Sequence, residues 1–419
     1  MQPFSGWTTL IGLMAAYAGL CGDITYAYGV FLPAMSQTFL WSRSALSGPY
    51  TLFFIVGGLL GPVAGLSVAR FGARKNIIIF NFIAALGLLG LSQVRALWQV
   101  YLFFGVLAGL GIGFGEFIPI TSVINNWFIR KRSLAMGLLF ASGGVGGFVL
   151  PPLISRIISV LGWRWAWVWL AGSHLLLTVI LGGILIRNRP EDLDQHPDGI
   201  SEGLGAAGMN HQAPDRKVYQ TLRDWSVKEA FRTPALWMLM ALFSIILYVT
   251  SLLTTHQVAY LQDLNFSPLV SATALGLMIG MSIVGRLAGG ILGMRIESRY
   301  LAAFFLAGMG LGVLALMNAR GMIFIGLYSI LTGIGFGGMI VLVPTFIGAY
   351  FGRANYSRII GWTIPVVTVI SAGSPVLAGF LRDATGSYFL PLTLAAVFCF
   401  AGIPIALLTR PPASCPHHE

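Results

Sequence analysis

The sequence predicts an all-α, polytopic membrane protein with 12 transmembrane helices in two pseudo-symmetric six-helix bundles. Three observations lead to this prediction: a shortage of charged residues, a series of long apolar segments, and an internal repeat that relates the two halves. Only 9% of the 419 residues are charged and 56% are hydrophobic, whereas a soluble domain carries about 25% charged residues. Most of the surface must therefore face something apolar.

The apolar segments are long enough to cross a bilayer, which takes about 20 residues of helix. The bilayer core offers no water to hydrogen-bond the backbone, so each segment is predicted to be helical. The 12 segments span residues 7–35, 45–69, 76–94, 98–124, 133–158, 165–186, 234–261, 269–293, 300–317, 321–347, 359–381 and 388–408.

A polar segment rich in Asp, Glu, Pro and Gly separates the sixth and seventh spans. Its composition predicts a partly disordered linker with a short amphipathic helix near residues 219–231. The predicted organisation is an N-terminal bundle at 1–186, a cytoplasmic linker at 187–232, and a C-terminal bundle at 233–419 that ends in a short cytoplasmic tail.

The distribution of Lys and Arg predicts the orientation in the membrane. With loops assigned alternately to the two sides, most of the 25 basic residues fall on the side of the N-terminus. The positive-inside rule then puts both termini and the linker in the cytoplasm of a multi-pass plasma (inner) membrane protein. The other side receives Arg43, Arg95, Arg156, Arg164, Arg320 and Arg382.

Several other classes of protein are not expected. The net charge of +11 comes from short basic clusters between apolar segments, which argues against nucleic-acid binding. The long apolar stretch that begins at Trp7 has no basic region before it, so a cleavable signal peptide is not expected. Cys21, Cys399 and Cys415 form no CxxC pair, so neither a metal site nor a disulfide framework is predicted.

An internal repeat relates the fourth span to the tenth. The string GIGFG at residues 111–115 recurs at 333–337, and WFIR at 127–130 is echoed by YFGR at 350–353. The pair Gly61 and Gly65 likewise matches Gly285 and Gly289. The nearly constant offset of about 223 residues indicates duplication. Two parallel repeats with a site at the midplane between them are a transporter architecture.

Two sequence signatures resemble those of a known family. Residues 65–75, GLSVARFGARK, resemble the loop signature of the major facilitator superfamily, although Ala69 replaces its usual acid. Residues 127–137, WFIRKRSLAMG, and the GRL string at 285–287 are similar to the monocarboxylate transporter branch and its oxalate/formate exchanger relatives. The resemblance covers nearly the whole chain and implies the major facilitator fold.

The resemblance also implies a role for Arg286 of the eighth span, because an arginine there pairs with the substrate carboxylate in the monocarboxylate branch. The acid that often lies one turn earlier is Ser282 in this chain, and the first-helix lysine of the animal members corresponds to Val30. The usual proton-handling pair is therefore missing, and proton coupling does not follow from the resemblance.

Charged side chains within a span are costly and are taken as candidates for function. Asp23, Glu116 and Arg286 are the ones well inside the predicted spans. The guanidinium of Arg286 presents a planar fork that suits a carboxylate, which predicts substrate binding; the alternative is a structural ion pair.

The two acids are the candidates for proton coupling. Glu116 lies at a depth similar to that of Arg286 but in the other half, so the hypothesis is that the two pair until a substrate carboxylate competes and frees Glu116 for a proton. The alternative is a carboxylate that serves helix packing. Asp23 follows Gly22, where a local helix distortion is expected, and either lines the cavity or is a bonded structural residue.

Six further residues are weaker candidates for substrate binding, because a phenol, an imidazole, an amide or an aromatic ring can contact an organic anion. For His256 the equal alternative is a satisfied histidine at the membrane interface, and for Trp362, Phe336 and Asn125 packing is the commoner role. His174 of the sixth span is predicted to lie in packing or at the periphery. The candidates are Tyr26, Tyr248, His256, Trp362, Phe336 and Asn125.

The sequence therefore predicts a secondary active transporter of a small organic anion, a monocarboxylate such as lactate or pyruvate, by alternating access and with proton coupling left open. The protein is expected to be a monomer, to bind no cofactor and not to be an enzyme. No Walker sequence is present, and residues 113–115 lie within a span, so nucleotide binding is not expected. The alternatives are proton-driven efflux of a cationic or amphipathic compound through Asp23 and Glu116, and a solute sensor that signals through the linker.

Overall fold

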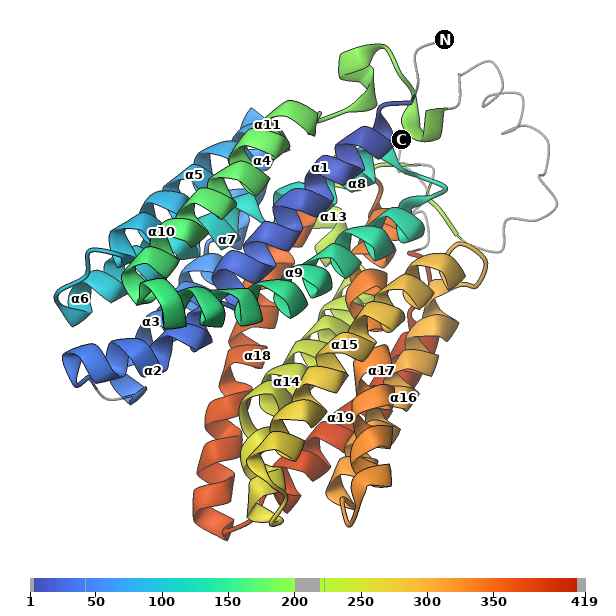
Figure 1. Ribbon diagram of the computed structural model, residues 1–419. Coiled ribbons are helices and arrows are strands. Elements are labelled where there is room, and N and C mark those ends of the chain that lie inside the picture. The colour runs from blue at the N-terminus through green and yellow to red at the C-terminus, as the bar shows by residue number, and fades with distance from the viewer. Residues whose placement is uncertain (1–3, 42, 200–218, 222, 413–419) are drawn as a thin grey trace. The chain divides into compact units, whose positions relative to one another are not determined.

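The computed structural model describes residues 4–41, 43–199, 219–221 and 223–412, and these are helical without any strand (Figure 1). Within them, ten helices are long and apolar enough to cross a bilayer. There are eleven if the bent pair Gly48–Leu59 and Gly61–Phe71 counts as one span. The remaining predicted segment, 359–381, lies within one continuous helix, α18 (Tyr356–Thr385). The all-α membrane fold is thus confirmed.

In the first half, several predicted spans consist of consecutive helical pieces. Three of these pieces, η1, η2 and η3, are π-helical. The elements are α1 (Gly6–Gly19), η1 (Leu20–Thr25), α2 (Tyr28–Phe39), α3 (Arg43–Leu59), α4 (Gly61–Phe71), α5 (Ala73–Leu91), α6 (Leu97–Val100), η2 (Tyr101–Ala108), α7 (Gly109–Gly115), α8 (Phe117–Trp127), α9 (Arg132–Leu161), α10 (Trp163–His174), η3 (Leu175–Ile180) and α11 (Leu181–Leu185).

In the second half the spans are uninterrupted helices. They are α14 (Pro234–Asp263), α15 (Pro268–Leu292), α16 (Ser298–Met317), α17 (Met322–Phe351), α18 and α19 (Phe389–Leu408).

The bend in the second predicted span has a local cause. Helix α3 ends at Leu59, α4 begins at Gly61, and the two meet at 53°. Pro62 stands in the first turn of α4, where its missing N–H costs nothing at a helix start but would break a continuous helix. The single predicted segment 45–69 is therefore two helices.

The chain divides into two compact units. The first comprises Met1–Ala213 with Ser357–Thr368, and the second comprises Pro214–Tyr356 with Val369–Glu419. Small residues bring helices together within each. In the first, a Cβ at Gly146 of α9 would overlap the carbonyl oxygen of Ala18 in α1. In the second, a Cβ at Gly337 of α17 would overlap the carbonyl oxygen of Ser282 in α15. Close backbone approach of this kind is the usual basis of helix packing in lipid.

Near its start the linker binds the first unit. It contains two 3₁₀ turns, η4 (Pro190–Leu193) and η5 (Pro197–Gly199). The carboxylate of Asp198 accepts hydrogen bonds from three successive backbone amides before α9, those of Ile129 (3.1 Å), Arg130 (2.7 Å) and Lys131 (3.4 Å).

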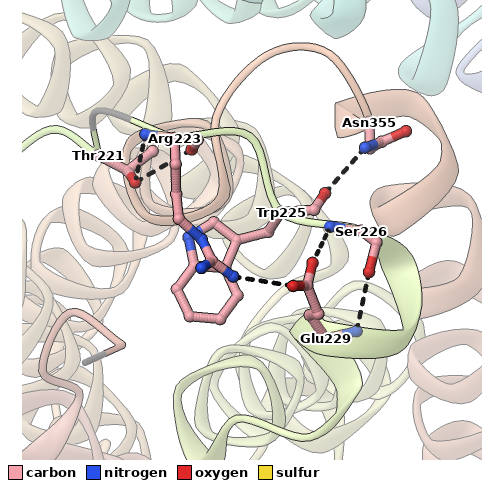
Figure 2. A network of polar contacts seen from close by, with 6 residues as sticks. All are labelled: Thr221, Arg223, Trp225, Ser226, Glu229 and Asn355. Carbon is pink, nitrogen blue, oxygen red and sulfur yellow. Dashed lines mark hydrogen bonds and ion pairs between the residues drawn. The ribbon is translucent and has the colours of Figure 1, made fainter. Parts of the chain in front are cut away.

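Near its end the linker binds the second unit (Figure 2). The Asp224 carboxylate accepts from the amides of Arg353 and Ala354, both at 2.9 Å, and Asn355 donates to the Trp225 carbonyl at 2.9 Å. The backbone amide of Trp225 also donates to the Phe351 carbonyl at 3.1 Å. This end of the linker is therefore attached to the loop between α17 and α18.

A short helix, α13 (Val227–Phe231), follows and is shorter than the amphipathic helix predicted near 219–231. Ser226 and Glu229 form a capping box, in which the Ser226 amide donates to the Glu229 carboxylate at 2.7 Å and the Glu229 amide donates to the Ser226 hydroxyl at 3.2 Å. Arg223 donates to the same carboxylate at 3.0 Å (Figure 2). Hydrogen bonds from Ser226 hold the pKa of Glu229 below its usual value. Residues 200–218 and 222 of the linker lie outside the described residues, so the prediction of partial disorder stays a prediction.

Candidate functional site

Arg286 lies in the last third of α15, buried within the second unit at 4% exposure. The close approach of α17 places the Phe336 ring beside it, and the guanidinium carbon lies 5.7 Å from the ring centroid. A guanidinium over an aromatic face gains electrostatic attraction without losing its hydrogen-bond donors. Two of the predicted site residues, Arg286 and Phe336, are thus brought together.

The other two candidates of the second unit, both on α14, have different neighbours. The Tyr248 ring packs edge-on against Phe398, with 5.0 Å between centroids, and belongs to a core cluster of apolar side chains. His256 is half-buried, and its Nδ1 lies 3.3 Å from the Tyr388 hydroxyl. These contacts do not involve Arg286, and they fit the packing and hydrogen-bonding alternatives that the sequence left open for both residues.

Glu116 occupies a break in the fourth span, between α7 and α8. Its backbone has φ −110° and ψ −103°, outside the helical region, and its side chain is buried at 8% exposure. The Cys21 thiol of η1 lies 3.8 Å from the carboxylate Oε1 and donates a weak hydrogen bond to it. The side chain is therefore held within the first unit and near the distorted part of the first span.

A proline accounts for the break. Pro119 has no N–H, so the carbonyl of Gly115, four residues earlier, receives no helical hydrogen bond at that position. Asn81 of α5 supplies a donor to this carbonyl at 3.3 Å, and it also donates to the Ile77 carbonyl at 2.8 Å. Residue 115 must be glycine, because a Cβ there would lie 2.5 Å from the Asn81 amide nitrogen.

Asp23 lies in the π-helical stretch η1, where the sequence predicts a local distortion. It is fully buried, and its Oδ1 accepts a hydrogen bond from the Ser173 hydroxyl at 2.7 Å. Its Oδ2 lies 3.6 Å from Nδ1 of His174, which is also fully buried. The Nε2 of His174 in turn lies 3.1 Å from Oδ1 of Asn81. Isolated π-helical turns occur often at functional sites.

Three predicted residues remain. Asn125 of α8 is fully buried, and Tyr26, just after η1, packs its ring against Gly147 of α9. Trp362 of α18 is 48% exposed. The contacts described here bring none of the three together with the buried acids or with Arg286.

Sequence reasoning missed the polar partners of the acids. His174 was predicted to lie in packing or at the periphery, yet it contacts both Asp23 and Asn81. Ser173, which precedes His174 on a largely apolar helix, is a further polar partner of Asp23. The signal that could have found them is the presence of polar side chains within spans, which must find partners among themselves in lipid.

Within the described residues, no group of three or more His, Cys, Asp or Glu side chains could hold a metal ion. The ionisable groups of the spans are instead arranged as separate small clusters: Cys21 with Glu116, Asp23 with His174, and Arg286 over Phe336. These clusters offer proton-binding and anion-binding groups.

Comparison with known proteins gives matches along most of the chain. The model of the Major Facilitator Superfamily matches residues 11–366. Monocarboxylate transporter 13 of Bos taurus is 26% identical over 416 residues, covering 99% of this chain and 91% of the bovine protein. Monocarboxylate transporter 2 of Homo sapiens is 23% identical over 426 residues, covering 96% of this chain and 85% of the human protein.

Two solved structures share the fold. One is the proton:xylose symporter XylE bound to 6-bromo-6-deoxy-D-glucose, with a TM-score of 0.74 and 12% identity over 96% of this chain and 95% of that one. The other is the human organic anion transporter MFSD10 (TETRAN), with a TM-score of 0.70 and 14% identity, covering 97% of this chain and 100% of that one. The sequence and structure matches confirm the predicted fold class and the resemblance to monocarboxylate transporters.

Proposed function

Because this chain belongs to the major facilitator superfamily, in its monocarboxylate transporter branch, we propose that it carries a small organic anion across the membrane. The chain is a membrane transporter, and the proposed substrate is a monocarboxylate such as lactate or pyruvate. Transport is by alternating access without hydrolysis of a nucleotide. The observation that carries the proposal is the buried guanidinium of Arg286.

Placing the charged side chain of an arginine within a membrane span costs free energy, so a functional role is expected for it. Insertion of a charged residue at the centre of a helix in lipid costs about 2.5–3.5 kcal/mol. The duplicated first half has Pro62 at the corresponding position, so the shared scaffold does not need a cation there. A planar guanidinium that stays protonated offers two parallel donors to a carboxylate. Binding an anion is the role that fits this chemistry.

The buried acids of the first unit supply the proposed proton coupling. Glu116 lies at a helix break with only a thiol as its described hydrogen-bond donor. A carboxyl group in such a site can take up a proton when an anion enters and the local balance of charge changes. If each anion moves together with one proton, an inward proton gradient can drive accumulation of the substrate, and no net charge crosses the membrane.

The test is a transport assay with purified protein in proteoliposomes. Uptake of radiolabelled lactate, pyruvate, formate and oxalate is measured for the unchanged protein, for Arg286→Ala and for Arg295→Ala. Arg295 follows α15 and is exposed, so its replacement removes one positive charge without touching the buried site. We expect saturable uptake of at least one monocarboxylate, a loss of at least tenfold in Arg286→Ala, and uptake within twofold of normal in Arg295→Ala.

The same variants distinguish anion uptake from the main alternative function, which is efflux of cationic or amphipathic compounds. If the protein expels cationic or amphipathic compounds through Asp23 and Glu116, Arg286→Ala should leave that efflux intact, and none of the four anions should enter the vesicles. Anion uptake that survives in Arg286→Ala would refute the proposed role of this residue. A solute sensor would show saturable binding of solute without flux in any of the three proteins.

A further inference from the structure

Four polar residues, three of them buried and Ser173 half-buried, form a cluster in the first unit where three helical elements meet. Asp23 comes from η1, Ser173 and His174 from the end of α10, and Asn81 from α5. Asp23, His174 and Asn81 have no exposed surface. Buried polar atoms are normally hydrogen-bonded, and each donor needs an acceptor. The donor and acceptor roles of these side chains can therefore be assigned atom by atom.

The amide of Asn81 can adopt only one orientation. Two backbone carbonyls, those of Ile77 at 2.8 Å and Gly115 at 3.3 Å, face one end of the amide. A carbonyl only accepts, so the end that faces them is the NH₂ group. The amide oxygen Oδ1 therefore points at Nε2 of His174, at 3.1 Å.

This orientation settles which nitrogen of His174 carries hydrogen. An amide oxygen accepts, so Nε2 must be the donor. In a neutral imidazole with hydrogen on Nε2, the other nitrogen, Nδ1, has only a lone pair. That lone pair faces Oδ2 of Asp23 at 3.6 Å, and neither atom has a hydrogen-bond partner among the described residues.

Two buried acceptors that face each other need a hydrogen between them. The carboxylate has a second oxygen that already accepts from Ser173, so Ser173 cannot satisfy Oδ2 as well. One added proton makes the contact a charge-assisted hydrogen bond, with a normal length of about 2.7–2.9 Å, whichever atom formally holds it. Without that proton the pair carries one uncompensated negative charge in a buried site.

We propose that Asp23 and His174 form one proton-binding site, in which a single proton is shared between Oδ2 and Nδ1 and sets the pH dependence of transport. This inference deepens the proposed function and rests on it for the transport part. When the proton leaves, the buried negative charge disfavours an anion elsewhere in the low-dielectric interior. Anion exchange should therefore slow as the pH rises and the pair loses its proton.

The other titratable groups on elements packed against the pair are mostly tyrosines: Tyr17 of α1, Tyr26 just after η1, Tyr28 of α2, Tyr50 of α3 and Tyr101 of η2. Cys21 lies in η1 itself, and Glu116 is reached through Cys21 and through Asn81 and Gly115. Basic residues on these helices stand toward their ends: Arg74 and Lys75 in α5, Arg132 and Arg156 in α9, and Arg164 in α10. Within the described residues, His174 is the basic side chain that lies within ion-pair distance of Asp23, so a proton shared with it is what balances the Asp23 charge.

The first measurement does not depend on transport. The ¹⁵N spectrum of histidine-labelled protein in detergent or lipid is recorded for the unchanged chain and for His174→Gln, and the signal missing from the variant belongs to His174. We expect hydrogen on Nε2 at every pH, with Nδ1 either protonated or accepting a strong hydrogen bond at pH 5.5; an Nδ1 that has no hydrogen and accepts no hydrogen bond at pH 5.5 would refute the shared proton. A neutral ring with hydrogen on Nδ1 and none on Nε2 would overturn the proposal, because Asp23 would then be satisfied without an added proton.

The second measurement follows anion exchange in proteoliposomes at equal internal and external pH, from pH 5.5 to 8.5. We use the Glu116→Gln background, so that titration of Glu116 cannot contribute. Exchange should fall at least fivefold across the range, and His174→Gln or Asp23→Asn should flatten the profile to within twofold. Asp23→Asn is informative even if His174→Gln folds poorly, since its amide donates to Nδ1 in place of the proton.

Two further outcomes are decisive. His196→Gln, in the linker, is the matched control and should keep the full pH profile. A steep profile that persists in Asp23→Asn and His174→Gln would refute the pair as the controlling site. If the unchanged protein exchanges no anion at any pH, the proposed function has failed instead, and the ¹⁵N spectrum still decides whether the pair binds a proton.

Discussion

Glu116 shows how one residue acquires a special environment from its neighbours. Pro119 removes a hydrogen-bond donor from the fourth span, Gly115 allows Asn81 to approach, and the backbone at Glu116 leaves the helical region. The carboxyl group is then buried beside the Cys21 thiol, and within the described part of the chain it forms no ion pair with a basic side chain. A carboxyl group without a bonded cation is free to gain or lose a proton as the charge around it changes.

Glu116→Gln tests whether the Glu116 carboxyl group carries the coupled proton. The amide keeps the size of the side chain but cannot carry a proton, so we expect an inward proton gradient to lose its stimulation of uptake. Exchange of labelled for unlabelled anion, which needs no net movement of protons, should stay within about threefold of normal. Both are measured in the same vesicles, with and without a pH gradient. Stimulation that persists in the variant would contradict the proposed role of Glu116.

The buried charges could be predicted from the sequence, but their partners could not. Asp23, Glu116 and Arg286 stand out because charges are rare in long apolar segments. Which side chains meet them depends on how the helices rotate against one another, and a single sequence does not specify this. The contact between His174 and Asp23 joins residues 151 positions apart and arises from the packing of α10 against η1. The pairing predicted between Glu116 and Arg286 stays a prediction.

At the scale of the element, the helix pair α15 and α17 supports Arg286. Gly337 of α17 faces the carbonyl oxygen of Ser282, and a Cβ there would also lie 2.9 Å from the backbone nitrogen of Arg286. Gly285 makes an equally close approach to the carbonyl of Ile334. The glycines of the repeated strings are therefore packing residues that fix the position of the arginine.

Gly337→Ala should weaken this pair, and Gly326→Ala provides a matched control on the same helix. An added methyl group at position 337 overlaps the backbone of α15, and overpacking of this kind costs about 1–3 kcal/mol. At position 326 a Cβ meets nothing within 4 Å, so alanine should be neutral or stabilise the helix by about 0.5–1 kcal/mol. Thermal unfolding in detergent measures both. Equal melting temperatures for the two variants would show that the close approach is not needed.

Hydropathy predicts the helices well because span length is set by the bilayer, and the predicted bounds fall within a few residues of the observed ones. It does not predict the interruptions. The π-helical stretches η1, η2 and η3 keep the same apolar composition as their surroundings, and they follow from local hydrogen bonding and packing. The interruptions with a visible signal are the bend before α4, at the Gly61-Pro62 dipeptide, the distortion at Gly22-Asp23 and the break before Pro119.

At the scale of the whole molecule, the linker makes the same kind of contact at both of its ends. Asp198 binds the amides of residues 129–131 in the first unit, and Asp224 binds those of Arg353 and Ala354 in the second. These loops match in the internal repeat, where WFIR corresponds to YFGR. A charged acceptor on backbone donors contributes more than a neutral one, so each aspartate anchors its loop.

Loss of either anchor should expose a basic loop to protease. In Asp198→Asn we expect trypsin to cleave after Arg130 or Lys131 several times faster than in the unchanged protein, and in Asp224→Asn to cleave after Arg353. Asp194→Asn, an exposed position in the same linker, is the control and should leave both rates unchanged. The fragments are identified by mass spectrometry. Unaltered cleavage in the first two variants would mean that the aspartates do not hold these loops.

The central claim is that Arg286 recognises a carboxylate, and equilibrium binding tests it most directly. Purified protein is titrated calorimetrically with lactate and pyruvate and with their uncharged amides, lactamide and pyruvamide. The account predicts saturable binding of at least one acid, no detectable binding of its amide, and loss of acid binding in Arg286→Ala but not in Arg295→Ala. Acid and amide that bind equally well, or acid binding that is unchanged in Arg286→Ala, would contradict it.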